Sequence, residues 1–122
     1  MRVYIAGPYR ADTPEGVDVN IAMAREAMAL LLQAGHTPFC PHSMTARFER
    51  DYPNIPDDRY LETDLEWLRF CDGILMLPGW QQSSGSRREF ELAREMGLDL
   101  FQASLDEELD LVFPGLLGGP NA

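Results

Sequence analysis

The sequence predicts a doubly wound α/β fold, in which helices flank a parallel sheet of four to five strands. Three observations support this prediction. Short apolar segments alternate with longer amphipathic segments, as expected for successive β–α–β units. Gly-Pro or Pro-Gly pairs follow two of the apolar segments and would end them as strands. The chain has 122 residues, 45% of them apolar, so we expect one flavodoxin- or Rossmann-like domain over 1–122.

Four strands and four helices are expected in alternation. The strands are predicted at 3–6, 36–39, 73–77 and 98–101, and the first of them is expected to be buried. The helices are predicted at about 18–34, 57–70, 84–96 and 105–112. Asp18 or Asn20 would cap the first helix, and Asp57 would cap the second. The irregular stretch 44–56 has room for one short helix and is expected to be a mobile loop over a site, and the tail 114–122 is expected to be loose.

The charge of the chain excludes several classes of protein. The formal net charge is −10, which would repel a nucleic acid polymer. The sequence contains no lysine, so neither a Schiff base nor a phosphate-loop lysine is available.

No apolar run approaches the roughly 18 residues of a membrane span. Met1 leads directly into a strand rather than a signal peptide. We therefore expect a cytoplasmic protein that acts on a small molecule and contacts no membrane.

The segment after the third predicted strand has the composition of an anion-binding turn. Ser83, Gly85 and Ser86 lie between an apolar strand and the start of a helix. Free backbone N–H groups and the helix dipole favour an anion at such a position. In a parallel sheet this turn lies at the carboxyl ends of the strands, where ligands bind. For any one serine, the alternative role is ordinary turn chemistry.

Three further residues are predicted at the same edge of the sheet. Gly7 and Arg10 follow the first strand, and His42 follows the second. Arg10 is either a solvated loop residue or a residue that binds phosphate bidentately, through two N–H groups of its guanidinium. His42 taken alone is more often structural than catalytic. The sequence Cys40-Pro41-His42 is too sparse for a metal site, so neither a metal nor a cofactor is expected.

Two carboxylates stand out from the solvent-facing ones. Asp64 falls on the apolar arc of the 57–70 helix, together with Tyr60 and Leu68, where an unpaired carboxylate is costly. It is either a structural aspartate, which caps a loop or pairs with an arginine, or a carboxylate of an active site. Glu89 either completes a capping box with Ser86 or is a functional carboxylate in the first turns of its helix. A carboxylate pair suits glycosyl chemistry, whose transition state resembles an oxocarbenium ion.

These residues together resemble the nucleoside 2-deoxyribosyltransferase superfamily, and most closely its 2′-deoxynucleoside 5′-phosphate N-hydrolase branch. The resemblance covers three stretches, namely 3–7 with Arg10, His42 after the second strand, and 64–93. The third stretch is the most specific, because both residue types and spacing agree without a gap. The Pro78-Gly79-Trp80 turn is similar to that of small, mostly uncharacterised relatives of these enzymes.

The resemblance implies a role for each matching residue. Glu89 would be the nucleophile that forms a glycosyl-enzyme intermediate, Asp64 would assist at the base or sugar, and Tyr4 would lie close to the nucleophile. Arg10 and Ser83 would hold a 5′-phosphate. The nucleoside transferases have an aspartate where this chain has Ser83, so the loss of that negative charge favours a nucleotide over a free nucleoside.

We therefore expect an enzyme that hydrolyses or transfers the N-glycosidic bond of a small (deoxy)nucleoside 5′-monophosphate. The resemblance also implies a homodimer, because the family builds its pocket across subunits. The alternative is a non-catalytic nucleotide-binding or sensing module, which would use Arg10, Ser83 and Gly85 but have no use for Asp64. A flavodoxin-like redox protein is a third class, supported by nothing beyond the fold.

Overall fold

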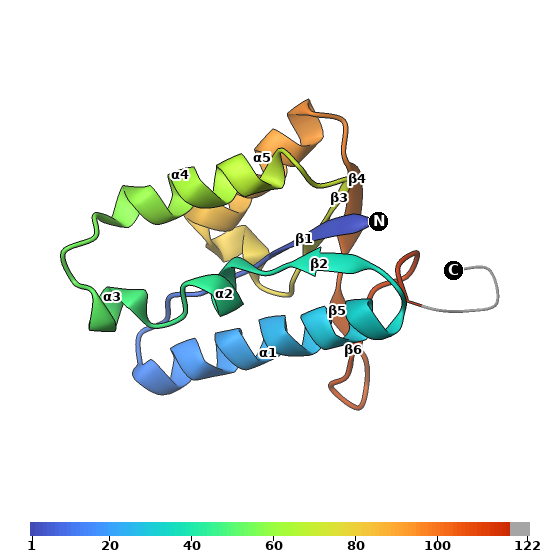
Figure 1. Ribbon diagram of the computed structural model, residues 1–122. Coiled ribbons are helices and arrows are strands. Elements are labelled where there is room, and N and C mark those ends of the chain that lie inside the picture. The colour runs from blue at the N-terminus through green and yellow to red at the C-terminus, as the bar shows by residue number, and fades with distance from the viewer. Residues whose placement is uncertain (118–122) are drawn as a thin grey trace.

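Four parallel strands form the central sheet, in the order β2-β1-β3-β4 (Figure 1). The computed structural model describes residues 1–117. The strands are β1 (Arg2–Ala6), β2 (Thr37–Phe39), β3 (Gly73–Met76) and β4 (Asp99–Gln102). β1 pairs with both β2 and β3, so Tyr4 lies beside Phe39 on one side and Ile74 on the other. The structure confirms the predicted α/β class with a parallel, Rossmann-like sheet.

Helices cover both faces of this sheet (Figure 1). The three long helices are α1 (Pro14–Gln33), α4 (Asp57–Leu68) and α5 (Ser84–Glu95). Successive side chains of β1 point to opposite faces of the sheet, because side chains alternate along a strand. Val3 and Ile5 pack in the core with α1, whereas Tyr4 and Ala6 pack in the core with α4 and α5. The residues of β1 from Val3 to Ala6 are 0–1% exposed, so this strand is the centre of the molecule.

α1 begins at Pro14, so the prediction that Asp18 or Asn20 caps it is wrong. Thr13 is the N-cap, and its Oγ1 accepts a hydrogen bond of 3.1 Å from the N–H of Gly16. Pro14 occupies the first helical position, where its missing N–H is not needed. The Thr-Pro-Glu-Gly sequence is therefore a helix start, although its composition equally suits a turn.

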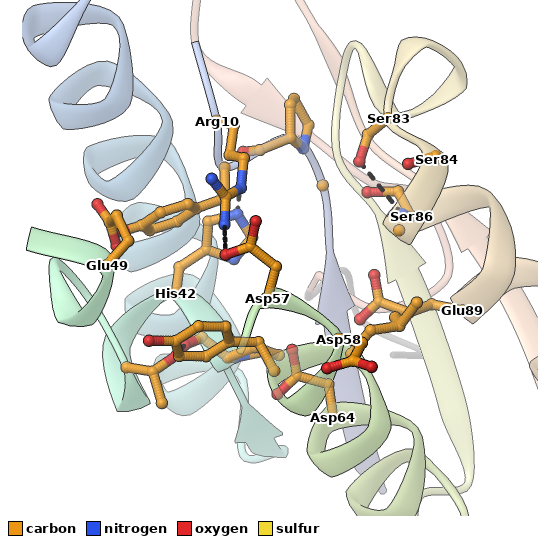
Figure 2. A pocket seen from close by; sticks show the side chains of 18 of the residues that line it. Arg10, His42, Glu49, Asp57, Asp58, Asp64, Ser83, Ser84, Ser86 and Glu89 are labelled. Atoms are coloured by element: carbon orange, nitrogen blue, oxygen red, sulfur yellow. Dashed lines mark hydrogen bonds and ion pairs between the residues drawn. The ribbon is translucent and has the colours of Figure 1, made fainter. Parts of the chain in front are cut away.

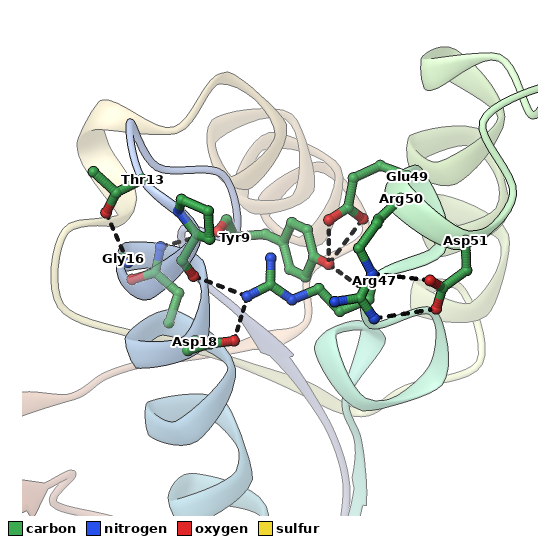
Figure 3. A network of polar contacts seen from close by, with 10 residues as sticks. Tyr9, Thr13, Gly16, Asp18, Arg47, Glu49, Arg50 and Asp51 are labelled. Atoms are coloured by element: carbon green, nitrogen blue, oxygen red, sulfur yellow. Dashed lines mark hydrogen bonds and ion pairs between the residues drawn. The ribbon is translucent and has the colours of Figure 1, made fainter.

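The stretch 44–56 contains one short helix, as its sequence allows. It follows α2 (Pro41–Met44) and contains α3 (Phe48–Asp51). The N–H of Arg47 donates to the hydroxyl of Tyr9 at 2.6 Å, and that hydroxyl donates to Glu49 at 2.9 Å (Figure 3). The guanidinium of Arg47 donates to the carbonyl of Pro14 at 2.8 Å and also pairs with Asp18. These contacts fasten the stretch to the loop after β1.

The helix predicted at 105–112 is wrong. The segment instead forms an antiparallel pair of β5 (Ser104–Leu105) and β6 (Leu111–Val112). A carboxylate oxygen of Asp106 accepts hydrogen bonds from the N–H groups of Glu108 and Asp110, both at 2.9 Å. Leu109 adopts a φ of 65°, in the left-handed region that a helix excludes. The aspartate therefore closes a turn, and the helical spacing of the apolar residues does not decide the structure.

The segment after β6 packs onto the core. Phe113 and Leu116 are each 1% exposed and join the core cluster that includes Val3 and Ile5. The looseness predicted from Pro114 onward is therefore wrong for 114–117, and the rest of that tail lies outside the described residues. The other predicted elements agree with the structure to within about two residues. Within residues 1–117, no helix has both the length and the apolar character of a membrane span.

Candidate active site

A cleft of about 580 Å³ opens beyond the carboxyl ends of β1, β2 and β3 (Figure 2). The chain leaves β1 toward β2 on one side, and β3 lies on the other, so the order of strands reverses there. Ligands of open α/β sheets bind at this position. Eight of the nine site residues predicted from the sequence line the cleft: Gly7, Arg10, His42, Asp64, Ser83, Gly85, Ser86 and Glu89. The ninth, Tyr4, lies in the sheet and contacts the cleft through Glu89.

Glu89 is buried at the inner end of the cleft. Only 6% of its surface is exposed, and the hydroxyl of Tyr4, itself 0% exposed, donates a hydrogen bond to its carboxylate. Burial raises the pKa of Glu89 to about 8; the Tyr4 hydrogen bond acts in the opposite direction, and the charge of Asp64 adds to the rise. The same burial, followed by the negative charge of Glu89, raises the pKa of Tyr4 well above its ordinary value. Burial therefore favours the protonated form of Glu89 in the ligand-free protein.

Asp64 faces the same cleft from α4 (Figure 2). Burial raises its pKa to about 7. Among residues 1–117, no arginine lies within ion-pair distance of Asp64. Asp64 is therefore not a structural aspartate that pairs with an arginine. The two carboxyl groups repel each other when both are ionised, as the effect of Asp64 on the pKa of Glu89 indicates. Near neutral pH the two carboxyl groups therefore titrate as a coupled pair, and the protons belong to the pair rather than to either residue alone.

The start of α5 excludes one of the two roles considered for Glu89, the capping box with Ser86. Ser83, not Ser86, is the N-cap, and its hydroxyl accepts a hydrogen bond of 3.2 Å from the N–H of Ser86. Glu89 lies one turn further along the helix and is bonded to Tyr4, so it does not cap the helix start. The hydroxyl oxygen of Ser86 is buried and has no hydrogen-bond partner among the described residues. The first turn of α5 thus presents the free hydroxyl of Ser86 together with the backbone N–H groups that precede the capped one.

The two glycines predicted at the site serve different purposes. A Cβ atom on Gly7 would lie 2.7 Å from the Cβ of Leu77, so only glycine allows the ends of β1 and β3 to approach this closely. A Cβ atom on Gly85 would meet only Leu61, at 4.0 Å. Gly7 is therefore required for packing, whereas Gly85 leaves open space beside the helix start.

Arg10 lies at the mouth of the cleft and is already paired. Its guanidinium donates to the carboxylate of Asp57 at 2.9 Å, and the two side chains are 62% and 78% exposed (Figure 2). Such an exposed pair contributes little to stability, about 0–1 kcal/mol, so another anion can compete for the arginine. Asp57 itself is the first residue of α4 rather than its cap, which is Pro56.

His42 is buried and lies near Pro8. Its Nε2 lies 3.0 Å from the carbonyl oxygen of Pro8 and therefore carries the proton in a neutral ring. Burial lowers the pKa of His42, which favours that neutral form. Its Nδ1 is then an acceptor, and it has no partner among the described residues. His42 thus combines a structural contact with an unused polar atom.

The sequence analysis missed several residues of the cleft. Tyr9, Glu49, Asp58 and Tyr60 line it, in addition to Asp57. Tyr60 could have been found, because it precedes Asp64 by one turn on the same arc of α4. Glu49 gives no such signal, since only the Tyr9 and Arg47 contacts bring α3 to the cleft. Within residues 1–117, no three His, Cys, Asp or Glu side chains gather as a metal would require.

Fold and cleft together define a Rossmann-like α/β protein with a carboxylate pair at the switch point of its sheet. Residues 1–102 match the family model described as "Domain of unknown function (DUF7768)". The chain therefore belongs to this family. No curated protein matches the sequence.

Two solved structures share the fold. A 2-deoxyribosyltransferase from Bacillus psychrosaccharolyticus gives a TM-score of 0.60 at 17% identity, over 84% of this chain and 71% of that chain. A 2-deoxyribosyltransferase from Leishmania mexicana gives a TM-score of 0.57 at 19% identity, over 94% of this chain and 80% of that chain. At these identities the likeness shows a common α/β fold.

Proposed function

We propose that the protein hydrolyses or transfers the N-glycosidic bond of a small (deoxy)nucleoside 5′-monophosphate, with Glu89 as nucleophile. One observation carries this proposal: Glu89 is buried in the cleft, accepts a hydrogen bond from Tyr4, and shares the cleft with Asp64. A carboxylate that lies beside a second, more exposed carboxyl group is the arrangement that glycosyl transfer uses. The fold that the chain shares with two 2-deoxyribosyltransferases supports the same class of reaction by analogy.

The proposed reaction assigns different protonation states to the nucleophile, Glu89, and to the proton donor, Asp64. The pKa of Glu89 is raised to about 8 and that of Asp64 to about 7, so near neutral pH the pair retains a proton. The reaction requires Glu89 to be ionised and Asp64 to carry the proton, which is the less populated form of the ligand-free pair because the pKa of Glu89 lies above that of Asp64. The Tyr4 hydrogen bond stabilises this state, because a hydrogen bond to a carboxylate favours its charged form.

The reaction then proceeds in two steps. An oxygen of Glu89 bonds to the anomeric carbon as the bond from that carbon to the base nitrogen breaks, and Asp64 supplies the proton that the leaving base needs. Water next attacks the anomeric carbon and gives its proton to Asp64. The bond between sugar and Glu89 breaks, which regenerates the carboxylate. A second base in place of water would complete a transfer instead of a hydrolysis.

The start of α5 and Arg10 support a phosphate at one end of the substrate. Helix N–H groups and the dipole of α5 attract an anion. The free hydroxyl of Ser86 can donate to it. Arg10 is the one arginine among the residues that line the cleft, and a phosphate can displace its exposed partner Asp57.

The test is the release of free base. Purified protein is incubated with each deoxynucleoside 5′-monophosphate, and the products are separated by chromatography. We expect base release by the wild type, loss of at least a thousandfold in Glu89→Gln, and normal release by Glu95→Gln, which changes an exposed residue at the end of the same helix. Thermal stabilisation by a nucleotide without any base release would instead support a binding or sensing module.

A further inference from the structure

Unpartnered polar atoms gather at the cleft. Within residues 1–117, four buried side-chain nitrogen or oxygen atoms have no hydrogen-bond partner, and three belong to residues that line the cleft: His42, Tyr60 and Ser86. A buried polar atom without a partner is unfavourable, because its lost contact with water is not replaced. Three such residues around one cleft indicate that a ligand supplies the missing partners.

Tyr60 is the member of this group to which neither the sequence nor the proposed chemistry assigns a role. It lies on α4, four residues before Asp64, so both side chains emerge on the same face of the helix. The phosphate end of the cleft lies at α5, and the reacting carboxylate of Glu89 comes from the same helix. Beyond Asp57, which pairs with Arg10, the wall formed by α4 and His42 is then left for the part of the substrate that departs, which is the base.

From this arrangement we propose that Tyr60 is a specificity-determining residue that hydrogen-bonds the base of the substrate. This inference rests on the proposed function. The neighbouring carboxylates of Asp58 and Asp64 only accept hydrogen bonds when ionised, whereas the Tyr60 hydroxyl can donate. Tyr60 therefore recognises an acceptor on the base, such as a carbonyl oxygen or a ring nitrogen.

The test compares Tyr60→Phe with Tyr52→Phe, which alters a tyrosine that is 57% exposed and lies outside the cleft. Both changes are made in a Glu89→Gln background, so that binding is measured by calorimetry without turnover. The ligands are the deoxynucleoside 5′-monophosphates and deoxyribose 5-phosphate, which lacks a base. The melting temperature of each ligand-free variant is recorded as a control for folding.

We expect Tyr60→Phe to weaken binding of at least one nucleotide by about three- to tenfold, as the loss of one neutral hydrogen bond does. Binding of deoxyribose 5-phosphate should not change. The melting temperature should be equal to or above that of the parent, because an unpartnered hydroxyl is removed. Tyr52→Phe should alter none of these values.

Two outcomes overturn the inference while the proposed function stands. Unchanged nucleotide affinity in Tyr60→Phe means that the hydroxyl does not contact the base. An equal loss for nucleotide and for deoxyribose 5-phosphate means that Tyr60 acts on the sugar or on the shape of the cleft. If the parent binds none of these ligands, the proposed function fails and the inference fails with it.

Discussion

At the scale of single residues, Glu89 has the environment that matters most for the account. It is buried, and it depends on one hydroxyl, that of Tyr4, for a hydrogen bond. A carboxyl group in such a place is unfavourable to ionise, and its raised pKa of about 8 expresses this. The molecule accepts this energetic cost at a cleft, where a reacting group is useful, rather than in its interior.

The raised pKa predicts how stability depends on pH. In the unfolded chain a glutamate releases its proton near pH 4, so between about pH 5 and pH 8 the folded state binds more protons than the unfolded state. The free energy of unfolding should therefore fall as pH rises through this window. Glu89→Gln removes the contribution, so its stability should exceed that of the wild type by an amount that grows to a few kcal/mol near pH 8.

Urea unfolding of both proteins at a series of pH values measures this difference. Of the remaining 19 acidic residues (20 less one), Asp64 is coupled to Glu89, whereas the others contribute equally to both proteins and cancel in the comparison. Curves of stability against pH that run parallel would mean that Glu89 is not perturbed by burial.

Tyr4 should affect the rate more than substrate binding. Tyr4→Phe removes the hydrogen bond that favours ionised Glu89, so the pKa of Glu89 should rise further. We expect kcat to fall about 10- to 100-fold with little change in KM, and the rising limb of the pH–rate profile to move to higher pH. The measurement is steady-state kinetics over pH, with circular dichroism as the control for folding. An unchanged kcat and profile would separate Tyr4 from the chemistry.

The residues of the site were predictable to different degrees. Asp64 could be selected from the sequence because it is a carboxylate on the apolar face of a helix, and Glu89 because it lies in the first turns of a helix and matches the nucleophile of the family that the chain resembles. The burial of Glu89 beside Tyr4 was not predictable from either feature. Tyr60 shares the arc of Asp64, yet the sequence does not reveal whether its hydroxyl has a partner. The pairing of Arg10 with Asp57 joins segments 47 residues apart and could not be read from either segment alone.

At the scale of elements, the start of α5 shows how a local pattern can be ambiguous. Serine is a favoured N-cap residue, so either Ser83 or Ser86 could cap the helix, and Ser86 with Glu89 also fits a capping box. Tertiary structure decides between them, because the buried Tyr4 engages Glu89 and leaves Ser83 as the cap. The same holds for 105–112, where the turn around Asp106 overrides a helical spacing of apolar residues.

The two serines should therefore respond differently to alanine. Ser83→Ala removes the cap and should lower the free energy of unfolding by about 1 kcal/mol. Ser86→Ala removes a hydroxyl that has no partner and should leave stability nearly unchanged, while it weakens binding of a nucleoside monophosphate. Denaturant unfolding and calorimetry on both variants give the two values. A larger loss of stability in Ser86→Ala than in Ser83→Ala would contradict this assignment of the cap.

At the scale of the whole molecule, the sheet and its layers followed from the alternation of segments. Four parallel strands and the three long helices agree with the prediction. The two central strands, β1 and β3, are buried on both sides and therefore form continuous apolar runs that the sequence reveals. The arrangement of the C-terminal segment did not follow, since its short strands bury only a few side chains and carry little periodicity.

Association of two copies is a prediction at this scale. The net charge of −10 makes two copies repel each other, so a homodimer should form through a surface on which positive and negative side chains balance. The outer face of α4 is such a place, because it exposes Trp67 and Phe70 at 48% and 63% beside the ion pairs of Arg59 with Glu62 and Arg69 with Glu66. We expect a dimer by sedimentation equilibrium and a shift toward monomer in Phe70→Ser. A wild-type monomer at all concentrations would remove this prediction.

The central claim is that Glu89 bonds covalently to the sugar, and mass spectrometry of the quenched reaction tests it most directly. The protein is mixed with a deoxynucleoside 5′-monophosphate, or with an analogue fluorinated at the 2′ position to slow the second step, and is then digested. We predict that the peptide containing Glu89 gains the mass of one deoxyribose 5-phosphate unit, and that Glu89→Gln gains none. Release of base with the Glu89 peptide unmodified, and equal release by Glu89→Gln, would contradict the account.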